Sequence, residues 1–286
     1  MKQKLTLLWA ILFFMTVFIS CEKDEEDNGT SPELPPQESL IIDLDQFTID
    51  SKSHNKVNQK LDMEALAASS NYEFAAGNIG FWNVLLTVTL VVPVAAFQTA
   101  FTQTPEFIGE STWQWSYDVN GFASTHTARL TGQIRSDDVK WEMYVQKSGV
   151  NGYPEFKWFE GTSALDGNSG TWTLYHSYEF QDELLEIDWS KSGNEIGQVT
   201  YSFVRETNND GEPEPFNGSY LTYGLQSGYF DAFYDIYFYD VWSNQFVNVD
   251  IEWSTTEYYG RVKAEHHFDD TNWHCWDNTG EDITCE

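Results

Sequence analysis

Histidines and aspartates gather near the C-terminus, in the segment HHFDDTNWHCWD. On an extended chain His267 and Asp269 would share one face of a strand, and His274 follows shortly after. Imidazole nitrogens and carboxylate oxygens bind divalent metals, so these three residues, with Asp270 and Asp277 nearby, form a candidate metal site. The alternative is a group of exposed polar residues at a strand end, and we assign no cofactor.

Aromatic rings and carboxylates alternate in the segment YFDAFYDIYFYD. Because side chains of a strand alternate between two faces, one face would carry Tyr229, Asp231, Phe233, Asp235, Tyr237 and Tyr239. Such a face could stack on sugar rings and hydrogen-bond their hydroxyl groups, or it could receive an envelope protein. Tyr and Phe also favour strands for their own sake, so ordinary strand composition is the alternative.

Cys275 and Cys285 lie close together in the sequence, with Gly280 between them to allow a turn. In an oxidising compartment this pair predicts a disulfide that closes a short hairpin. A reactive or metal-ligating pair of thiols is the alternative.

The sequence contains none of the common motifs that indicate a catalytic mechanism. It contains no Gly-x-Ser-x-Gly elbow, phosphate-binding glycine loop, His-Glu-x-x-His or paired Cys-x-x-Cys signature. A glycosidase needs only two suitably placed carboxylates and leaves no local pattern, so catalysis stays open. We assign no catalytic residue. His126, His176 and His266 fall at inward-facing positions, where we expect hydrogen-bonded core histidines, and a set of ligands is the alternative.

The N-terminus reads as a secretory signal. Lys2 and Lys4 precede an apolar run over 5–19, and Ser20 stands just before Cys21. This arrangement resembles the lipobox of bacterial lipoproteins, although Phe18 and Ile19 depart from its usual pattern. The resemblance implies a signal peptide over 1–20 and a lipid anchor on Cys21. An ordinary signal peptide or a transmembrane anchor is the alternative.

The segment after Cys21 is acidic and contains prolines. Residues 22–27 resemble the export signal of surface lipoproteins, and a solvated linker is the alternative reading. We interpret residues 21–40 as a tether between the membrane and a folded domain. The whole chain has 45 acids and 15 bases, a formal net charge of −30, so nucleic acid is excluded as a partner.

Residues 106–286 alternate apolar and polar positions between short turn segments, which predicts about ten antiparallel strands. Two-residue turns at Asn120-Gly121 and Ser227-Gly228 would place the apolar sets of neighbouring strands on one face. One apolar face on a long meander must curl into a barrel or be covered by another element.

Residues 41–105 supply that cover. They include a 21-residue apolar run, Phe81 to Phe101, which we interpret as a helical element that packs on the sheet and is kinked or broken at Pro93. Its length would also allow a membrane span. The predicted fold is therefore mainly β: an antiparallel meander, curled or closed like a barrel, packed on an N-terminal apolar helical segment.

The layout also resembles uncharacterised β-rich outer-membrane lipoproteins of Gram-negative bacteria, with WQWSY opening the meander and a Cys-Trp-Asp hairpin closing it. The resemblance implies an address in the outer membrane, at the cell surface, but no activity. We expect a non-catalytic binding or structural module of the envelope. The alternatives are a glycan-acting hydrolase with paired carboxylates and a lipocalin-like carrier of a hydrophobic ligand.

Overall fold

The computed structural model describes residues 29–47, 70–119 and 125–285. Residues 31–286 form one compact unit. The predicted signal peptide, Cys21, the acidic segment and the predicted turn at Asn120-Gly121 lie outside the described residues.

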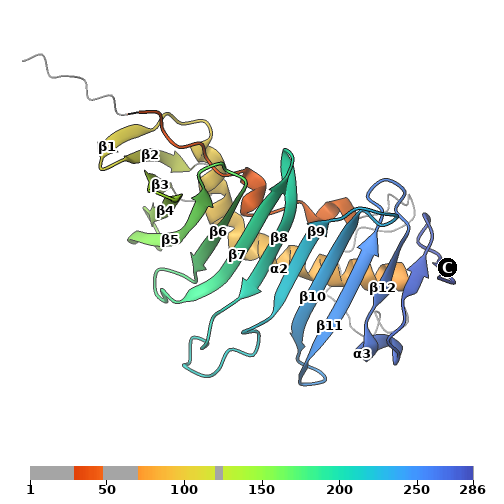
Figure 1. The fold of residues 1–286 in the computed structure, drawn as a ribbon. Helices are drawn as coiled ribbons and strands as arrows, with labels where there is room; N and C mark the ends of the chain where they lie inside the picture. Colours follow the sequence, from red (N-terminus) through yellow and green to blue (C-terminus); the bar gives the residue numbers. More distant parts are fainter. Residues whose placement is uncertain (1–28, 48–69, 120–124, 286) are drawn as a thin grey trace, which may run out of the picture. The chain divides into compact units, whose positions relative to one another are not determined.

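Within the described residues, fourteen strands follow one another in a single antiparallel sheet whose order is the order of the sequence (Figure 1). Neighbouring pairs therefore need only short connections. The fold is mainly β as predicted. In the part of the chain that the structure describes, the edge strands β1 and β14 do not pair with each other, so the sheet is open and not a closed barrel. The strands are β1 Glu106–Gly109, β2 Thr112–Val119, β3 His126–Ile134, β4 Asp138–Lys147, β5 Tyr153–Ala164, β6 Ser169–Tyr175, β7 Glu183–Ser192, β8 Glu195–Phe203, β9 Tyr220–Leu225, β10 Ala232–Asp240, β11 Gln245–Trp253, β12 Gly260–Lys263, β13 His274–Trp276 and β14 Asp282–Ile283.

Alternation within each strand divides the sheet into a buried inner face and a wet outer face. In β4 the side chains of Val139, Trp141 and Met143 are buried, whereas Lys140 and Glu142 between them are partly exposed. Sheets with one solvated face show this pattern because successive side chains point to opposite sides.

The strands on either side of each predicted turn place the expected residues on the inner face. Their pairing register differs from the one that a two-residue turn would give. Val119 pairs with His126, and Leu225 pairs with Ala232. Two-residue turns would have paired Val119 with Phe122 and Leu225 with Phe230. The second connection is longer because the backbone N–H of Gln226 bonds the carbonyl oxygen of Asp231 across four intervening residues.

The inner face is covered by one long helix, α2 Asn71–Ala100. Ser70 caps it, since its hydroxyl accepts the N–H of Glu73 while the Glu73 carboxylate accepts the N–H of Ser70. The helix runs across the strands, from β12 and β13 at its start to β2 and β3 at its end (Figure 1). It continues through Pro93 to Ala100, so the predicted break at this proline is wrong.

One side of α2 enters the core and the other does not. Its buried side includes Trp82, Leu86, Leu90 and Phe97, all of them at most 1% exposed. Val91 lies on the open side and is 49% exposed, so only one side of the apolar run packs on the sheet. By length and composition, α2 could cross a membrane. Of its most apolar 18-residue stretch, 33% is buried in the fold.

Residues before α2 also pack under the sheet. The 3₁₀ turns η1 Gln37–Ser39 and η2 Leu44–Phe47 bring buried Leu40 and Phe47 to the inner face. Trp172 donates its indole N–H to the Ser39 hydroxyl at 3.1 Å. The predicted tether therefore ends too late, because 31–40 belong to the folded unit.

Candidate functional site

The candidate site lies on the outer face of β9, β10 and β11, where rings and carboxylates meet. We call Tyr220, Asp235, Tyr237, Phe246 and Asp250 the aromatic–acidic patch. Tyr220 is on β9, Asp235 and Tyr237 are on β10, and Phe246 and Asp250 are on β11. In the sheet Tyr237 lies opposite Tyr220, and Asp235 lies opposite Asp250. Directly opposed side chains are close enough to interact, so the sheet itself assembles the patch.

The three rings of the patch contact one another in a row across the strands. Tyr237 and Phe246 are nearly parallel, with centroids 4.8 Å apart, and Tyr220 lies 5.7 Å from Tyr237. Phe246 is 36% exposed. Because Tyr237 and Phe246 turn their faces toward each other, the patch offers a ligand ring edges and hydroxyl groups as well as apolar surface.

The two carboxylates of the patch have different partners. Tyr220 donates its hydroxyl to Asp235 at 3.3 Å, and Lys263 forms a 2.6 Å ion pair with Asp250. Partial burial raises the pKa of Asp235, and the negative charge of Asp250 raises it further, against the opposing effects of Tyr220 and Lys263. The pKa of Tyr220 is raised in turn, first by burial and then by Asp235. Asp235 therefore takes up a proton more readily than a fully exposed aspartate does.

A cavity of about 410 Å³ opens on the same outer face, over β4 to β8. Its lining includes Thr162, Thr171, Asp188 and Gln198, with Asp138 at one side. These are hydroxyl, amide and carboxylate groups, so the cavity suits a ligand that both donates and accepts hydrogen bonds. Sequence reasoning missed it because its residues come from five strands.

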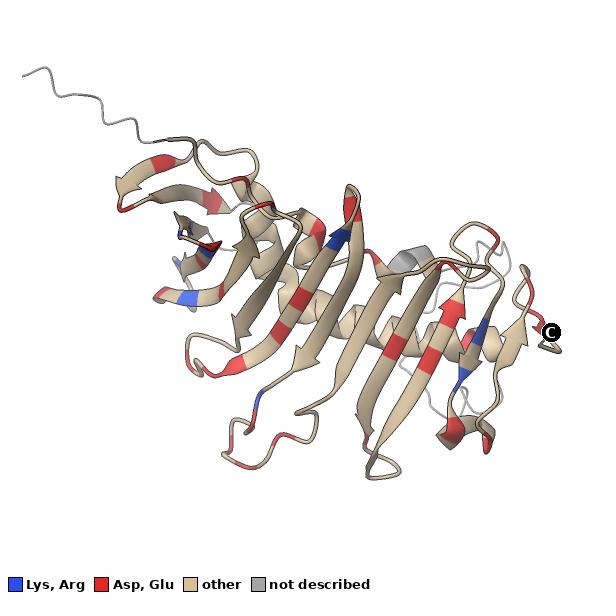
Figure 2. Ribbon diagram, viewed as in Figure 1, with Lys and Arg blue, Asp and Glu red and all other residues tan. Residues whose placement is uncertain are grey.

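A single cross-strand row of side chains joins the cavity to the patch. Each member lies directly opposite the next on the neighbouring strand, from β5 to β11. We call it the threonine–aspartate row, and its members are Thr162, Thr171, Asp188, Thr200, Thr222, Asp235 and Asp250. At about 4.8 Å per strand the row is about 29 Å long. Acidic positions recur along it on β7, β10 and β11 (Figure 2).

Two hydroxyl pairs order this row. The hydroxyls of Thr200 and Thr222 are 2.9 Å apart, and those of Thr162 and Thr171 are 3.3 Å apart. A hydroxyl group that gives its proton to a neighbour keeps lone pairs for a ligand. The row therefore presents regularly spaced donors and acceptors on an open surface.

Of the six residues predicted for the 229–240 face, four lie on β10 and two precede it. Phe233, Asp235, Tyr237 and Tyr239 lie on the outer face of β10 as expected. Tyr229 precedes the strand, is 70% exposed and stacks on Tyr259 at 4.3 Å.

The other members of that face have structural partners. Asp231 accepts the N–H and the hydroxyl of Thr255, which joins two loops. Phe233 covers Gly224, where a Cβ atom would come within 2.3 Å of its ring. The neighbours Tyr220 and Phe246 complete the patch, and only the strand register identifies them.

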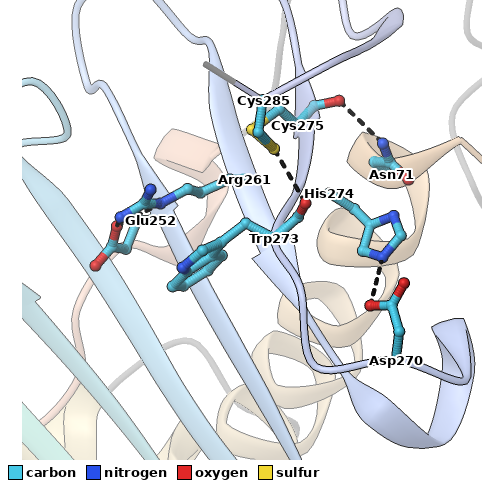
Figure 3. The surroundings of a disulfide bond; sticks show 8 residues. All are labelled: Asn71, Glu252, Arg261, Asp270, Trp273, His274, Cys275 and Cys285. Atoms are coloured by element: carbon cyan, nitrogen blue, oxygen red, sulfur yellow. Dashed lines mark hydrogen bonds and ion pairs between the residues drawn. A yellow bond between two sulfur atoms is a disulfide. The ribbon is translucent and has the colours of Figure 1, made fainter.

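The predicted metal residues do not converge. His267 lies on the short helix α3 Glu265–Phe268 and not on a strand, with its ring stacked on Phe74 at 3.8 Å. Asp269 ends that helix with a left-handed backbone, at φ 57°. His274 stacks on Phe268 and lies 3.1 Å from Asp270 (Figure 3). Within the described ranges, no three His, Cys, Asp or Glu side chains are placed to hold a metal ion.

Of the histidines predicted to point inward, His126 is buried on β3, whereas His176 follows β6 and is half-buried. His266 is exposed on α3, so its predicted position is wrong. The chain forms α3 where we expected the strand to continue.

Cys275 and Cys285 form the predicted disulfide, with their Cα atoms 5.3 Å apart (Figure 3). The hairpin that they close packs beside the start of α2. Arg261 lies over the Trp273 ring at 4.3 Å and binds Glu252 from the neighbouring strand. This region is held by many contacts and has a structural role.

Compared with known protein families, with curated proteins and with solved structures, the chain matches none.

Proposed function

We propose that this protein is a lipid-anchored, non-catalytic binding module of the outer membrane, exposed at the cell surface, and that it binds a polyhydroxylated polymer such as a glycan. The observation that carries the proposal is the threonine–aspartate row. Regularly spaced hydroxyl and carboxylate groups over about 29 Å match an extended ligand with a repeated pattern of hydroxyl groups. The aromatic–acidic patch adds apolar contact at one end of the row.

The lipid anchor rests on the lipobox-like segment ending at Cys21, and the surface address rests on the acidic segment after it. A glycan-facing role suits an acidic outer face, because neutral sugars are not repelled by it as phosphates would be.

The structure favours binding over the two alternatives. A hydrolase would hold a sugar between two carboxylates in a cleft. Asp235 and Asp250 are neighbours on a sheet face and do not line the cavity. The cavity is lined by Asp138 and Asp188, but Asp138 is held in a 2.6 Å ion pair with Arg135. A lipocalin-like carrier needs an apolar interior open to a ligand. Here α2 and residues 31–47 pack into that interior.

Calorimetry with soluble neutral polysaccharides, a β-glucan and a mannan, tests the proposal. Thr222→Val keeps the shape of the side chain and removes one hydroxyl from the middle of the row. We expect it to weaken binding about tenfold, since a lost hydrogen bond to a ligand costs about 1.4 kcal/mol. Thr131→Val, on the outer face of β3 away from the row, is the matched control and should bind as the wild type does.

Two results would overturn the proposal. One is equal binding by the wild type and Thr222→Val for every polysaccharide tested, including no binding at all. The other is release of reducing sugar that Asp188→Asn in the cavity abolishes, which would establish the hydrolase alternative.

A further inference from the structure

The open side of α2 carries exposed apolar side chains. Val84, Val88 and Val91 are 61%, 72% and 49% exposed. Their spacing places them on one face of the helix, and we call them the valine stripe. Phe81 and Leu85 beside them are only partly buried.

This face lacks the charges that the exposed side of a helix normally carries. From Phe74 to Pro105 the sequence has no Asp, Glu, Lys or Arg, although the chain contains 45 acids and 15 bases. The fold does not explain the stripe, because the opposite side of α2 supplies the residues that pack on the sheet. An uncharged, exposed and apolar face of this kind marks a contact surface.

A second copy of the chain fits the stripe poorly. Three partly exposed valines offer a few hundred Å² at most, whereas a stable dimer buries about 800 Å² on each partner. Two chains that each carry a formal charge of −30 would also repel each other.

A lipid bilayer fits the stripe better. Hydrocarbon requires an uncharged face, and a small apolar area suffices when an anchor already holds the protein at the membrane. The stripe is uncharged and small, as this partner requires.

We propose that the valine stripe contacts the acyl region of the membrane to which the chain is anchored. The inference rests on the lipid anchor of the proposed function and adds an orientation to it. The stripe faces away from the sheet, on the side of α2 opposite its buried residues. Contact there directs the threonine–aspartate row away from the bilayer, toward the ligand that we propose.

Photolabelling by lipid tests the contact. The full chain, purified from membranes of cells that process it, is reconstituted in phosphatidylcholine vesicles that contain a phosphatidylcholine with a diazirine on its acyl chain. After irradiation, mass spectrometry should find label on the α2 peptide at the stripe and none at Glu186 or Thr222 on the outer face. The triple variant Val84→Asn, Val88→Asn, Val91→Asn should lose this label and keep its melting temperature. Val150→Asn, at an exposed valine of a loop, is the matched control and should keep it.

The other outcomes separate the contact from the anchor. A chain that is lipidated at Cys21 and bound to vesicles but unlabelled at the stripe overturns the contact and leaves the anchor intact. If the purified chain carries no covalent lipid on Cys21 but is still labelled at the stripe, the contact is supported and the anchor is overturned. Dimers in sedimentation that the triple variant abolishes would make a second copy the occupant and overturn the proposal.

Discussion

Asn71, the first residue of α2, donates its side-chain amide to the backbone carbonyl of Cys275 at 2.9 Å (Figure 3). The backbone N–H of Asn71 binds Asp282 on β14. The start of the helix is therefore tied to both strands of the hairpin that the disulfide closes. Residues more than 200 positions apart meet here, so this corner joins the start of α2 to the C-terminal end of the folded unit.

Replacing both Cys275 and Cys285 by Ala should lower the free energy of unfolding by about 2 to 3 kcal/mol, because the unfolded chain regains the entropy of a short open loop. Urea unfolding of both proteins, with and without reductant, measures the difference. Reductant should bring the wild type to the stability of the variant and leave the variant unchanged. If reductant frees both thiols of the wild type but leaves its stability unchanged, the disulfide does not stabilise the fold.

Leu86→Asp and Val88→Asp should differ sharply, although the two residues are two positions apart on α2. Leu86 is 0% exposed, and an unpaired carboxylate in the core should cost several kcal/mol and leave little folded protein. Val88 is open to solvent, so the same change there should shift stability by about 0.5 kcal/mol or less. Thermal unfolding monitored by circular dichroism compares them. Equal loss in both variants would mean that the open side of α2 is also buried.

The sequence predicts which side chains of a strand lie on the inner face of the sheet, because this depends only on the alternation of side chains along the strand. The turn at Ser227-Gly228 illustrates the limit. The true connection shifts the register by two residues, which moves the partner of Tyr223 from Ala232 to Tyr234. Both partners lie on the inner face, so the core was predicted correctly while the cross-strand neighbours were not. The threonine–aspartate row depends on those neighbours, and for this reason it was not predicted.

Long-range packing explains the error at the histidines. The strand was expected to run through His267, but β12 ends at Lys263 and α3 follows. The ring of His267 lies against Phe74, from the distant helix α2, and nothing local in the sequence announces this contact. The cysteine pair was predictable because its two members are close in sequence and a turn between them suffices.

Cys21→Ala should release the protein from membranes, because the proposed lipid is its strong attachment once the signal peptide has been removed. Labelling cells with a radioactive fatty acid and fractionating them checks both lipid and location. Deleting residues 23–27 should keep the label and the membrane association but remove accessibility to protease added outside the cell. An Ala variant that stays fully membrane-bound would refute the anchor, and unchanged protease accessibility of the deletion would refute the export signal.

Stability should fall as the pH decreases below about 6.5, partly through His267. Burial lowers the pKa of His267 from its ordinary value of 6.5, and the neighbouring His266 and His274 lower it further, against the effect of Asp269. A lowered pKa means that the unfolded chain takes up this proton at a higher pH than the folded one does. The contribution is therefore fully present above pH 6.5 and is lost as the pH falls from 6.5 through the lower folded value.

Urea unfolding at intervals between pH 8 and pH 5 measures this slope. His267→Gln removes the titrating ring, so its stability should change less with pH than that of the wild type over the same interval. Thr271→Ala, an exposed and uncharged change in the following loop, should keep the wild-type slope. The carboxylates contribute equally to all three proteins, so the difference between slopes isolates the histidine. If His267→Gln and the wild type lose stability in parallel, the stacking of this ring on Phe74 does not couple the fold to pH.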